Sequence, residues 1–287
     1  MKEKINNKKN QKKWDKMKSR SSELPMNEEG RYYHINCGQG DLARYILTCG
    51  DPERAEKIAA LFDEVNIERR HREFITFTGK YRNIPLSVMA TGIGTDNAAI
   101  AVIESAQCVN NATYIRLGSC GAIQDNIKLG DLVITERALR YEDTTLNYAS
   151  SDIEAISSPE VLEVLKKAVK ELGYKYHTGI TCTTSDFYAG QGRKIPGFPI
   201  QNPNLVRDLK QKGVKNFEME MAAYFILAKI SNYPLRAGGV CAVYADRGGG
   251  KTVSVKDLIR AEMRCIKTGL RAVEILYQID LQKSTPS

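Results

Sequence analysis

The sequence has no apolar stretch that approaches the roughly 20 residues needed to cross a lipid bilayer. Its lysine-rich N-terminus is followed by no apolar segment of the kind found in secretory signals, so we expect a cytoplasmic protein with no membrane partner. No linker rich in Pro, Gly or Ser interrupts the later part of the chain. We therefore expect one folded domain over residues 31–287.

Patterns for metal ions and disulfides are also missing. The seven cysteines stand singly, none forms a CxxC pair, and their odd number argues against a closed disulfide framework. The three histidines, His34, His71 and His177, do not have the spacing of zinc ligands. We expect buried, reduced cysteines, and neither a metal ion nor an organic cofactor.

The net charge of +8 comes almost entirely from one end of the chain. Residues 1–20 contribute +7, which leaves about +1 for the remaining 267 residues. This Lys- and Asn-rich segment has too few apolar side chains to offset the entropy cost of ordering it. We expect residues 1–30 to form a basic, disordered tail and the protein to bind no nucleic acid; a tether to RNA or to a membrane is the alternative.

Helix and strand patterns alternate along the rest of the chain. The apolar run Tyr45–Cys49 ends at Gly50, and Asp51-Pro52-Glu53 then has the residues typical of a helix start. Further strands are expected over residues 74–78, 86–90 and 114–117 and around 180–182 and 240–244, and further helices from Asp96, Ser158, Met219 and about Val255. This alternation predicts an α/β fold with a central mixed sheet covered by helices.

The sequence makes two further predictions, one about a turn and one about a helix face. The segment Gly118-Ser119-Cys120-Gly121 is expected to end the strand before it. The helix that follows Ser158 is expected to pack through one apolar side, formed by Leu162, Leu165, Val169 and Leu172.

Three expected strand ends carry glycine together with arginine or a hydroxyl group. They are Gly50 to Arg54, Arg116 to Ser119, and the region around Asp246. Ligands of open α/β sheets bind at the carboxyl ends of strands, where helix-start amides and guanidinium groups suit a phosphate. Each motif alone is weak evidence, because a glycine at a strand end is more often only a turn.

A glycine run near the C-terminal helix resembles part of a phosphate-binding P-loop. In Gly248-Gly249-Gly250-Lys251-Thr252 the first glycine that a P-loop requires is replaced by Ala245. We expect a flexible loop or lid here, and no nucleoside triphosphatase.

Six motifs in order resemble those of one enzyme family. They are Gly50 to Arg54, His71 to Phe74, Thr91 to Gly94, Arg116 to Gly121, Phe187 to Arg193, and Glu218 to Glu220. Together they resemble the hexameric purine and uridine nucleoside phosphorylases, closest to the uridine enzymes, over about residues 32–280. The resemblance implies a partly barrel-like sheet, a nucleoside and inorganic phosphate as substrates, and a homo-oligomer that is at least a dimer and in the family a trimer of dimers.

The resemblance also assigns roles to individual residues. Phosphate is expected at Gly50, Arg54, Arg72, Arg116 and Ser119. The ribose is expected at His34, Glu218, Met219 and Glu220. The base is expected at Cys120, Phe187, Gln191, Arg193 and Tyr244. Catalysis is assigned to Arg54, Arg116, Asp246 and Arg247. Arg72 and His34 are expected to reach the site of a neighbouring subunit, and the family allows a monovalent cation near Glu73.

The identity of the base is the open question at this stage. Gln191 with Arg193 resembles the pair that binds a pyrimidine, since an amide and a guanidinium match the uracil edge. Ser119-Cys120 and Asp246 resemble the purine enzymes instead, where an acid protonates the base. We favour uridine phosphorolysis; the alternatives are a purine phosphorylase with Asp246 as general acid, a hydrolase, and a non-catalytic nucleoside-binding protein. An Asp246 that only pairs with Arg247 or another cation is the simpler interpretation of that residue.

Overall fold

The computed structural model describes residues 21–284, so the basic segment 1–20 and its expected disorder lie outside the described residues. Contacts of the folded chain extend back to Leu24, which packs against the core, and to Met26, which forms a β-bridge with Tyr32. No helix in this described range is long and apolar enough to span a membrane.

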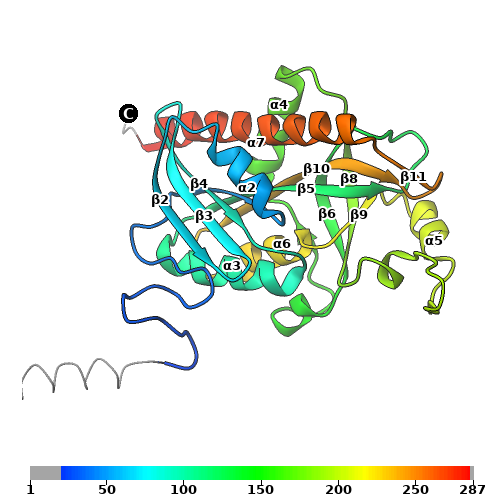
Figure 1. Cartoon of the computed structure of the whole chain (residues 1–287), viewed down its shortest axis with the longest axis horizontal. Coiled ribbons are helices and arrows are strands. Elements are labelled where there is room, and N and C mark those ends of the chain that lie inside the picture. Colours follow the sequence, from blue (N-terminus) through cyan, green and yellow to red (C-terminus); the bar gives the residue numbers. More distant parts are fainter. Residues whose placement is uncertain (1–20, 285–287) are drawn as a thin grey trace, which may run out of the picture.

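The strands form one mixed sheet (Figure 1). In chain order they are β1 (Tyr45–Cys49), β2 (Glu64–His71), β3 (Phe74–Tyr81), β4 (Ile84–Ala90), β5 (Thr113–Ala122), β6 (Leu132–Tyr141), β7 (Ala155–Ile156), β8 (Tyr176–Thr184), β9 (Asn216–Glu218), β10 (Arg236–Asp246) and β11 (Lys251–Thr252). They lie in the order β11-β10-β6-β8-β9-β5-β1-β4-β3-β2, with β7 beside β6. Because β10 also pairs with β5, five strands close into a barrel, which confirms the expected partly barrel-like sheet.

Six α-helices cover the two faces of the sheet in the described part of the chain. They are α2 (Pro52–Ala59), α3 (Thr95–Cys108), α4 (Pro159–Glu171), α5 (Leu205–Gln211), α6 (Met221–Ile230) and α7 (Val255–Ser284). Figure 1 shows α2, α4 and α7 on one side of the sheet and α3 and α6 on the other. Each side has its own buried core, as expected for two helix layers packed on one sheet.

The segment Gly118-Ser119-Cys120-Gly121 lies inside β5, so the expected turn is wrong. The strand continues because β10 pairs with it in parallel from Thr113 to Ala122. The glycines serve close packing between strands instead. A Cβ on Gly118 would lie 2.7 Å from the Cys241 Sγ, and one on Gly121 would lie 2.8 Å from the Arg247 Cγ.

Helix α4 packs through a face that contains two of the four expected residues, Leu165 and Val169, but not the other two. Its buried side chains are Val161, Val164, Leu165, Ala168 and Val169. Leu162 and Leu172 are only partly buried. The observed residues follow the i, i+3, i+4, i+7, i+8 spacing of a helix face, and this face lies against α7 and β10.

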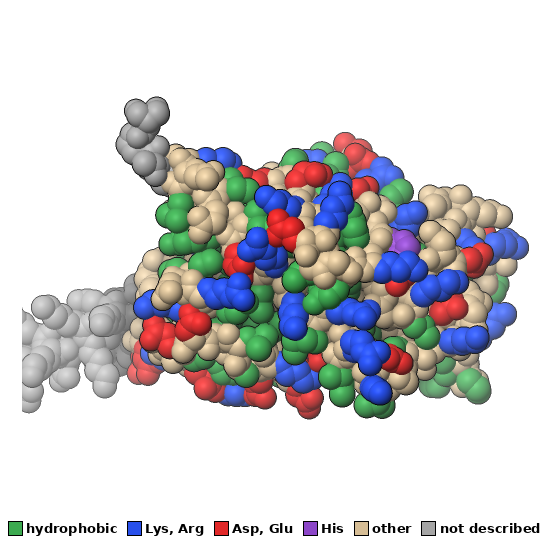
Figure 2. All heavy atoms as spheres, turned by 90° about the horizontal axis from the view of Figure 1, so that it is seen from above, with side chains coloured by type: hydrophobic (Ala, Val, Ile, Leu, Met, Phe, Trp, Pro, Cys, Tyr) green, Lys and Arg blue, Asp and Glu red, His purple; other side chains and the backbone are tan. Residues whose placement is uncertain are grey.

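The outer surface of α7 carries charges of both signs. Figure 2 looks onto this side of the molecule and shows Lys and Arg side chains interspersed with Asp and Glu. Several of them pair, among them Arg260 with Asp257 and Arg271 with Glu171. On this face the basic residues do not form one continuous patch of the kind that binds nucleic acid.

Candidate active site

Two loops meet at the carboxyl ends of the parallel strands β1 and β4. The strands end in register at Cys49 and Ala90, and the amide of Gly92 donates to the carbonyl of Gly50 at 3.1 Å. A Cβ on Gly50 would lie 2.9 Å from the Gly92 carbonyl oxygen, so no larger residue fits. Asp51 caps α2 immediately afterwards, accepting from the Glu53 amide at 2.9 Å. This edge therefore presents helix-start amides, as an anion site requires.

Arg116 is a buried cation with donors to spare. Its side chain extends from β5, pairs through Nη2 with Glu220, and has Nε 3.6 Å from Glu218. Burial disfavours its charged form, but Glu220 and Glu218 more than offset this and raise its pKa above the ordinary value. Nε and Nη1 are buried and have no hydrogen-bond partner. Unpaired buried donors of a permanent cation indicate a place for an anionic ligand.

Arg54 approaches the same stretch of β5 from α2. Its Nη1 donates to the Leu117 carbonyl at 3.1 Å, and its Nε donates to Glu262 of α7 at 2.9 Å. Glu262 also binds Lys57 at 2.8 Å. The sequence did not reveal Glu262, because it lies 208 positions from Arg54 and belongs to no motif.

Tyr244 belongs to this arginine group in the structure. The Tyr244 hydroxyl accepts from Arg54 Nη2 at 3.4 Å. Tyr244, which we expected at the base, therefore lies beside Arg54, a residue that we expected to bind phosphate. Ser119 lies three residues beyond Arg116 in β5 and is partly exposed.

Glu218 and Glu220 have different surroundings despite their spacing. Glu220 accepts from the Gly94 amide at 2.8 Å and pairs with Arg116. Glu218 accepts from the amides of Glu220 and Met221, both at 2.8 Å, and from the Thr183 hydroxyl. Burial first, and then the charge of Glu220, raises the pKa of Glu218 to about 7.

These contacts define what each carboxylate can do. Glu218 caps the start of α6 and has its oxygens occupied by protein donors. Glu220 is held against Arg116 at the end of the Thr91–Gly94 motif. Met219, between them, is partly exposed. Two protein donors contact the Glu220 carboxylate and three contact that of Glu218, so Glu220 keeps more capacity to accept from a sugar, and Met219 is the partly exposed residue of this motif.

A second group of arginines lies around Gln191. Arg247 donates through Nη2 to the Gln191 carbonyl at 2.9 Å, and the buried Gln191 side chain donates to Thr184 at 3.2 Å. The Arg193 guanidinium stacks 3.8 Å above the Phe187 ring and donates to the Phe187 carbonyl at 2.9 Å.

No carboxylate neutralises this second group within the residues that the structure describes. Arg193 and Arg247 donate there to the carbonyls of Phe187 and Gln191 and form no ion pair, and Arg247 Nε is buried without a partner. Burial, and then the charge of Arg193, lowers the pKa of Arg247 to about 10. The pair therefore favours a ligand that accepts hydrogen bonds or carries negative charge.

Asp246 ends β10 and closes a tight turn. Its carboxylate accepts from the amides of Gly248 and Gly249, at 3.0 and 2.8 Å, and the chain returns as β11. The expected pairing with Arg247 or another cation is wrong for the described residues, in which Asp246 has no ion pair. The glycine run forms the turn of a hairpin, and Lys251 and Thr252 of the expected loop belong to β11.

Cys120 is buried in β5, opposite Val243 of β10. Burial, and then a hydrogen bond with Cys241, raises its pKa well above the ordinary value. All seven cysteines are buried and unpaired in disulfides, as expected.

His34 and Arg72 come together in a surface cluster with Tyr33 and His71. Tyr33 packs edge-on against both histidine rings, and Arg72 Nη2 donates to its hydroxyl at 3.2 Å. Arg72 occupies the turn between β2 and β3 with φ of 53°, a conformation that is unusual for a residue other than glycine. Among the described residues, no hydrogen bond, ion pair or ring contact joins this cluster to Arg54, Arg116 or Glu220.

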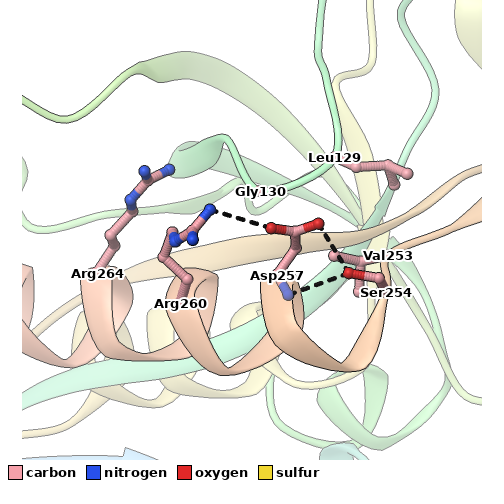
Figure 3. Close-up of a pocket in the computed structure, with 7 residues that line it drawn as sticks. All are labelled: Leu129, Gly130, Val253, Ser254, Asp257, Arg260 and Arg264. Carbon is pink, nitrogen blue, oxygen red and sulfur yellow. Dashed lines mark hydrogen bonds and ion pairs between the residues drawn. The ribbon is translucent and has the colours of Figure 1, made fainter.

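A separate cavity of about 310 Å³ lies where α7 begins. Figure 3 shows Asp257 between Arg260 and Ser254, so the Arg260 charge is compensated by its neighbour on the helix.

Residues 21–284 contain no group of three or more His, Cys, Asp and Glu side chains that could hold a metal ion. Glu73, where the resemblance allows a monovalent cation, is an exposed carboxylate whose Cγ would lie 3.0 Å from a Cβ on Gly92. One exposed carboxylate does not make a complete cation site.

Comparison with known proteins identifies the family of this chain. A family model described as the phosphorylase superfamily matches residues 44–276. A uridine phosphorylase of Thermococcus kodakarensis is 50% identical over 79% of this chain and 82% of its own. One of Escherichia coli is 32% identical over 85% of this chain and 97% of its own. A Trypanosoma brucei nucleoside phosphorylase that shows uridine phosphorylase activity has a similar structure, with a TM-score of 0.81 and 26% identity over 87% of this chain and 99% of its own. The chain therefore belongs to the phosphorylase superfamily.

Proposed function

We propose that this protein is a uridine phosphorylase that converts uridine and inorganic phosphate to uracil and ribose 1-phosphate. The observation that carries the pyrimidine assignment is the unneutralised group of Arg193, Arg247 and Gln191. Arginine supplies donors and the amide supplies both a donor and an acceptor, which matches the carbonyl and N–H edge of uracil. Relatives named uridine phosphorylase, at 50% and 32% identity, support the same substrate.

The reaction is a displacement at the anomeric carbon of the ribose. A phosphate oxygen forms a bond to C1′ while the bond from C1′ to N1 of uracil breaks, and the electron pair of that bond leaves with the base. The free donors of Arg116 hold the phosphate, and Glu220 accepts hydrogen bonds from the ribose hydroxyls. Negative charge that develops on the uracil carbonyls is stabilised by Arg193 and Arg247. Positioning and electrostatic stabilisation supply the rate enhancement, so no covalent intermediate is required.

The balance of buried charge supports a site completed by a second subunit. Within one chain the cations of Arg54, Lys57 and Arg116 face the carboxylates of Glu218, Glu220 and Glu262. A phosphate dianion entering this balanced group needs further positive charge. We infer that Arg72 supplies it from a partner, in a cytoplasmic homo-oligomer that is at least a dimer and, by family resemblance, a trimer of dimers acting in nucleoside salvage.

Replacing Arg193 by Ala tests the pyrimidine assignment. Loss of its guanidinium removes charged donors from the uracil carbonyls, so kcat/KM for uridine should fall by about 10²-fold or more. Arg207→Ala is the matched control, because Arg207 is exposed on α5 and pairs only with its neighbour Asp208. Equal activity of both variants on uridine would refute the role of Arg193.

A purine phosphorylase is the second candidate, because Asp246 stands at the carboxyl end of β10 beside Arg247. A general acid needs its carboxyl group available to the leaving base. The Asp246 carboxylate is instead engaged by two amides of its own turn. We therefore place this candidate second.

A further inference from the structure

The buried carboxylate of Glu104 contacts one segment of the chain in three ways. Glu104 lies in α3 and is 4% exposed. It accepts from the His34 amide at 3.1 Å, from the Ile35 amide at 3.0 Å and from the His34 ring Nδ1 at 2.6 Å. No Lys or Arg pairs with it in the described part of the chain. A buried carboxylate without such a cation is stabilised only by these three donors, so its position and that of His34 depend on each other.

We propose that Glu104 is a positioning residue that orients His34 to bind the 5′-hydroxyl of a nucleoside held by a second subunit. The proposal rests on the proposed function. Glu104 would act through the His34 ring and would not itself touch the substrate.

The hydrogen bond to Glu104 fixes which ring nitrogen remains available. A carboxylate accepts only, so Nδ1 carries the proton that it donates to Glu104. In the neutral ring Nε2 is then an acceptor, which suits a hydroxyl donor. The His34 side chain is 30% exposed, while the Tyr33 ring packs edge-on at 5.1 Å and limits its rotation.

The surroundings of His34 indicate where that nitrogen is used. Tyr33 joins His34 to Arg72, and His71 Nδ1 lies 3.3 Å from the His34 carbonyl. The same surface cluster therefore carries a sugar-binding group and a phosphate-binding group. Within residues 21–284, no hydrogen bond, ion pair or ring contact joins His34 or Arg72 to Arg54, Arg116 or Glu220. One docked subunit would therefore deliver both to a partner's site.

The test compares uridine with 5′-deoxyuridine, which lacks the hydroxyl that His34 would bind. We expect the wild type to prefer uridine and Glu104→Gln to lose about tenfold in kcat/KM for uridine, with little change for 5′-deoxyuridine. The ratio of the two values should fall toward one. His34→Ala should give the same ratio, and the double variant should lower it no further.

Two measurements separate this role from general damage to the fold. Glu274→Gln changes a buried glutamate of α7 that pairs with Arg82 and Arg271, and it should leave the substrate ratio unchanged. Nitrogen NMR of the wild type, a measurement that needs no variant, should show His34 protonated at Nδ1 and unprotonated at Nε2.

Three results would overturn the proposal. They are an Nε2-protonated His34, a wild-type substrate ratio near one, and a Glu104→Gln variant that slows both nucleosides equally. A wild type that releases uracil from neither nucleoside overturns the proposed function and this inference with it. An active enzyme with an unchanged ratio in the variant overturns this inference alone.

Discussion

At the scale of single residues, Arg116 is a buried cation whose charge is compensated by two neighbouring carboxylates. The residue is 4% exposed, and its guanidinium lies between the carboxylates of Glu218 and Glu220, residues that are each 3% exposed. Removing one member of such a buried group leaves an uncompensated charge, which typically costs about 3–5 kcal/mol. The three side chains therefore depend on one another for their stability in the folded protein.

Glu218 makes stability depend on pH in a defined direction. Its pKa is about 7 in the folded protein against an ordinary value of 4.5, so the folded state holds the proton more tightly than the unfolded state does. Its contribution to stability is complete below about pH 4.5 and is lost as the pH rises to about 7. Between pH 5 and 8 the wild type should therefore lose on the order of 2 kcal/mol more than Glu218→Gln does. Urea unfolding at both values measures this, and parallel losses in the two proteins would contradict it.

Asp246→Asn distinguishes a turn residue from a general acid. The Asn side-chain oxygen can still accept from the Gly248 and Gly249 amides, so the turn should persist. We expect kcat for uridine to stay within about threefold of the wild type, whereas loss of a general acid costs about 10²–10⁴-fold. Steady-state rates with uridine and with inosine decide between the two roles. A collapse of inosine cleavage alone would favour the purine alternative.

Motif chemistry identified many of the residues in the two arginine groups, but not the residues that hold them. Arg54, Arg116, Gln191, Arg193 and Glu220 each stand in a short motif with glycines or neighbouring polar groups. Glu104, Thr183 and Glu262 do not, because their partners lie 70, 35 and 208 positions away. Their roles arise only when α3, β8 and α7 come together.

At the scale of secondary structure, the start of α6 is the element on which the site depends most. Thr183 of β8 donates to Glu218 and accepts from the Ala222 amide at 3.2 Å, while Glu218 caps the preceding two amides. The helix start thereby positions Glu220, which accepts from the Gly94 amide and pairs with Arg116.

Thr183→Val keeps the shape of the side chain and removes both hydrogen bonds. Leaving buried groups unsatisfied should lower the free energy of unfolding by about 2–3 kcal/mol, and should raise KM for uridine as Glu220 loses its support. Denaturant unfolding and steady-state kinetics measure the two effects. Thr183→Ser retains the hydroxyl and should lose much less in both, so equal losses in Val and Ser would show that the hydroxyl has no such role.

Local patterns predicted strands and helices where one segment determines its own structure. The run Tyr45–Cys49 and the start of α7 near Val255 are confirmed. The strand β2 was not predicted, because its sequence EVNIERRH is charged and half-exposed and is held by pairing with β3. The Gly118–Gly121 segment was assigned to a turn because glycine usually marks one, whereas here pairing with β10 decides its conformation.

At the scale of the whole molecule, the proposed site is complete only when two subunits meet. Arg72 and His34 form one surface cluster, while Arg54, Arg116 and Glu220 form the buried group. Arg72 has a φ of 53° in its turn, a left-handed conformation that arginine seldom adopts.

Subunit complementation tests this arrangement. Arg72→Ala and Arg116→Ala should each lower kcat/KM for uridine by about 10²-fold. When both are expressed together, mixed dimers contain one site with both arginines intact, so up to about a quarter of the wild-type activity should return. Separately purified variants that are mixed without exchange of subunits provide the control. No recovery in mixed oligomers would show that Arg72 serves its own subunit.

The most direct test of the central claim is product release from uridine and from inosine, each with and without inorganic phosphate. We expect uracil and ribose 1-phosphate from uridine only when phosphate is present, and little or no hypoxanthine from inosine. Hypoxanthine as the main product, or uracil released equally well without phosphate, would contradict the claim.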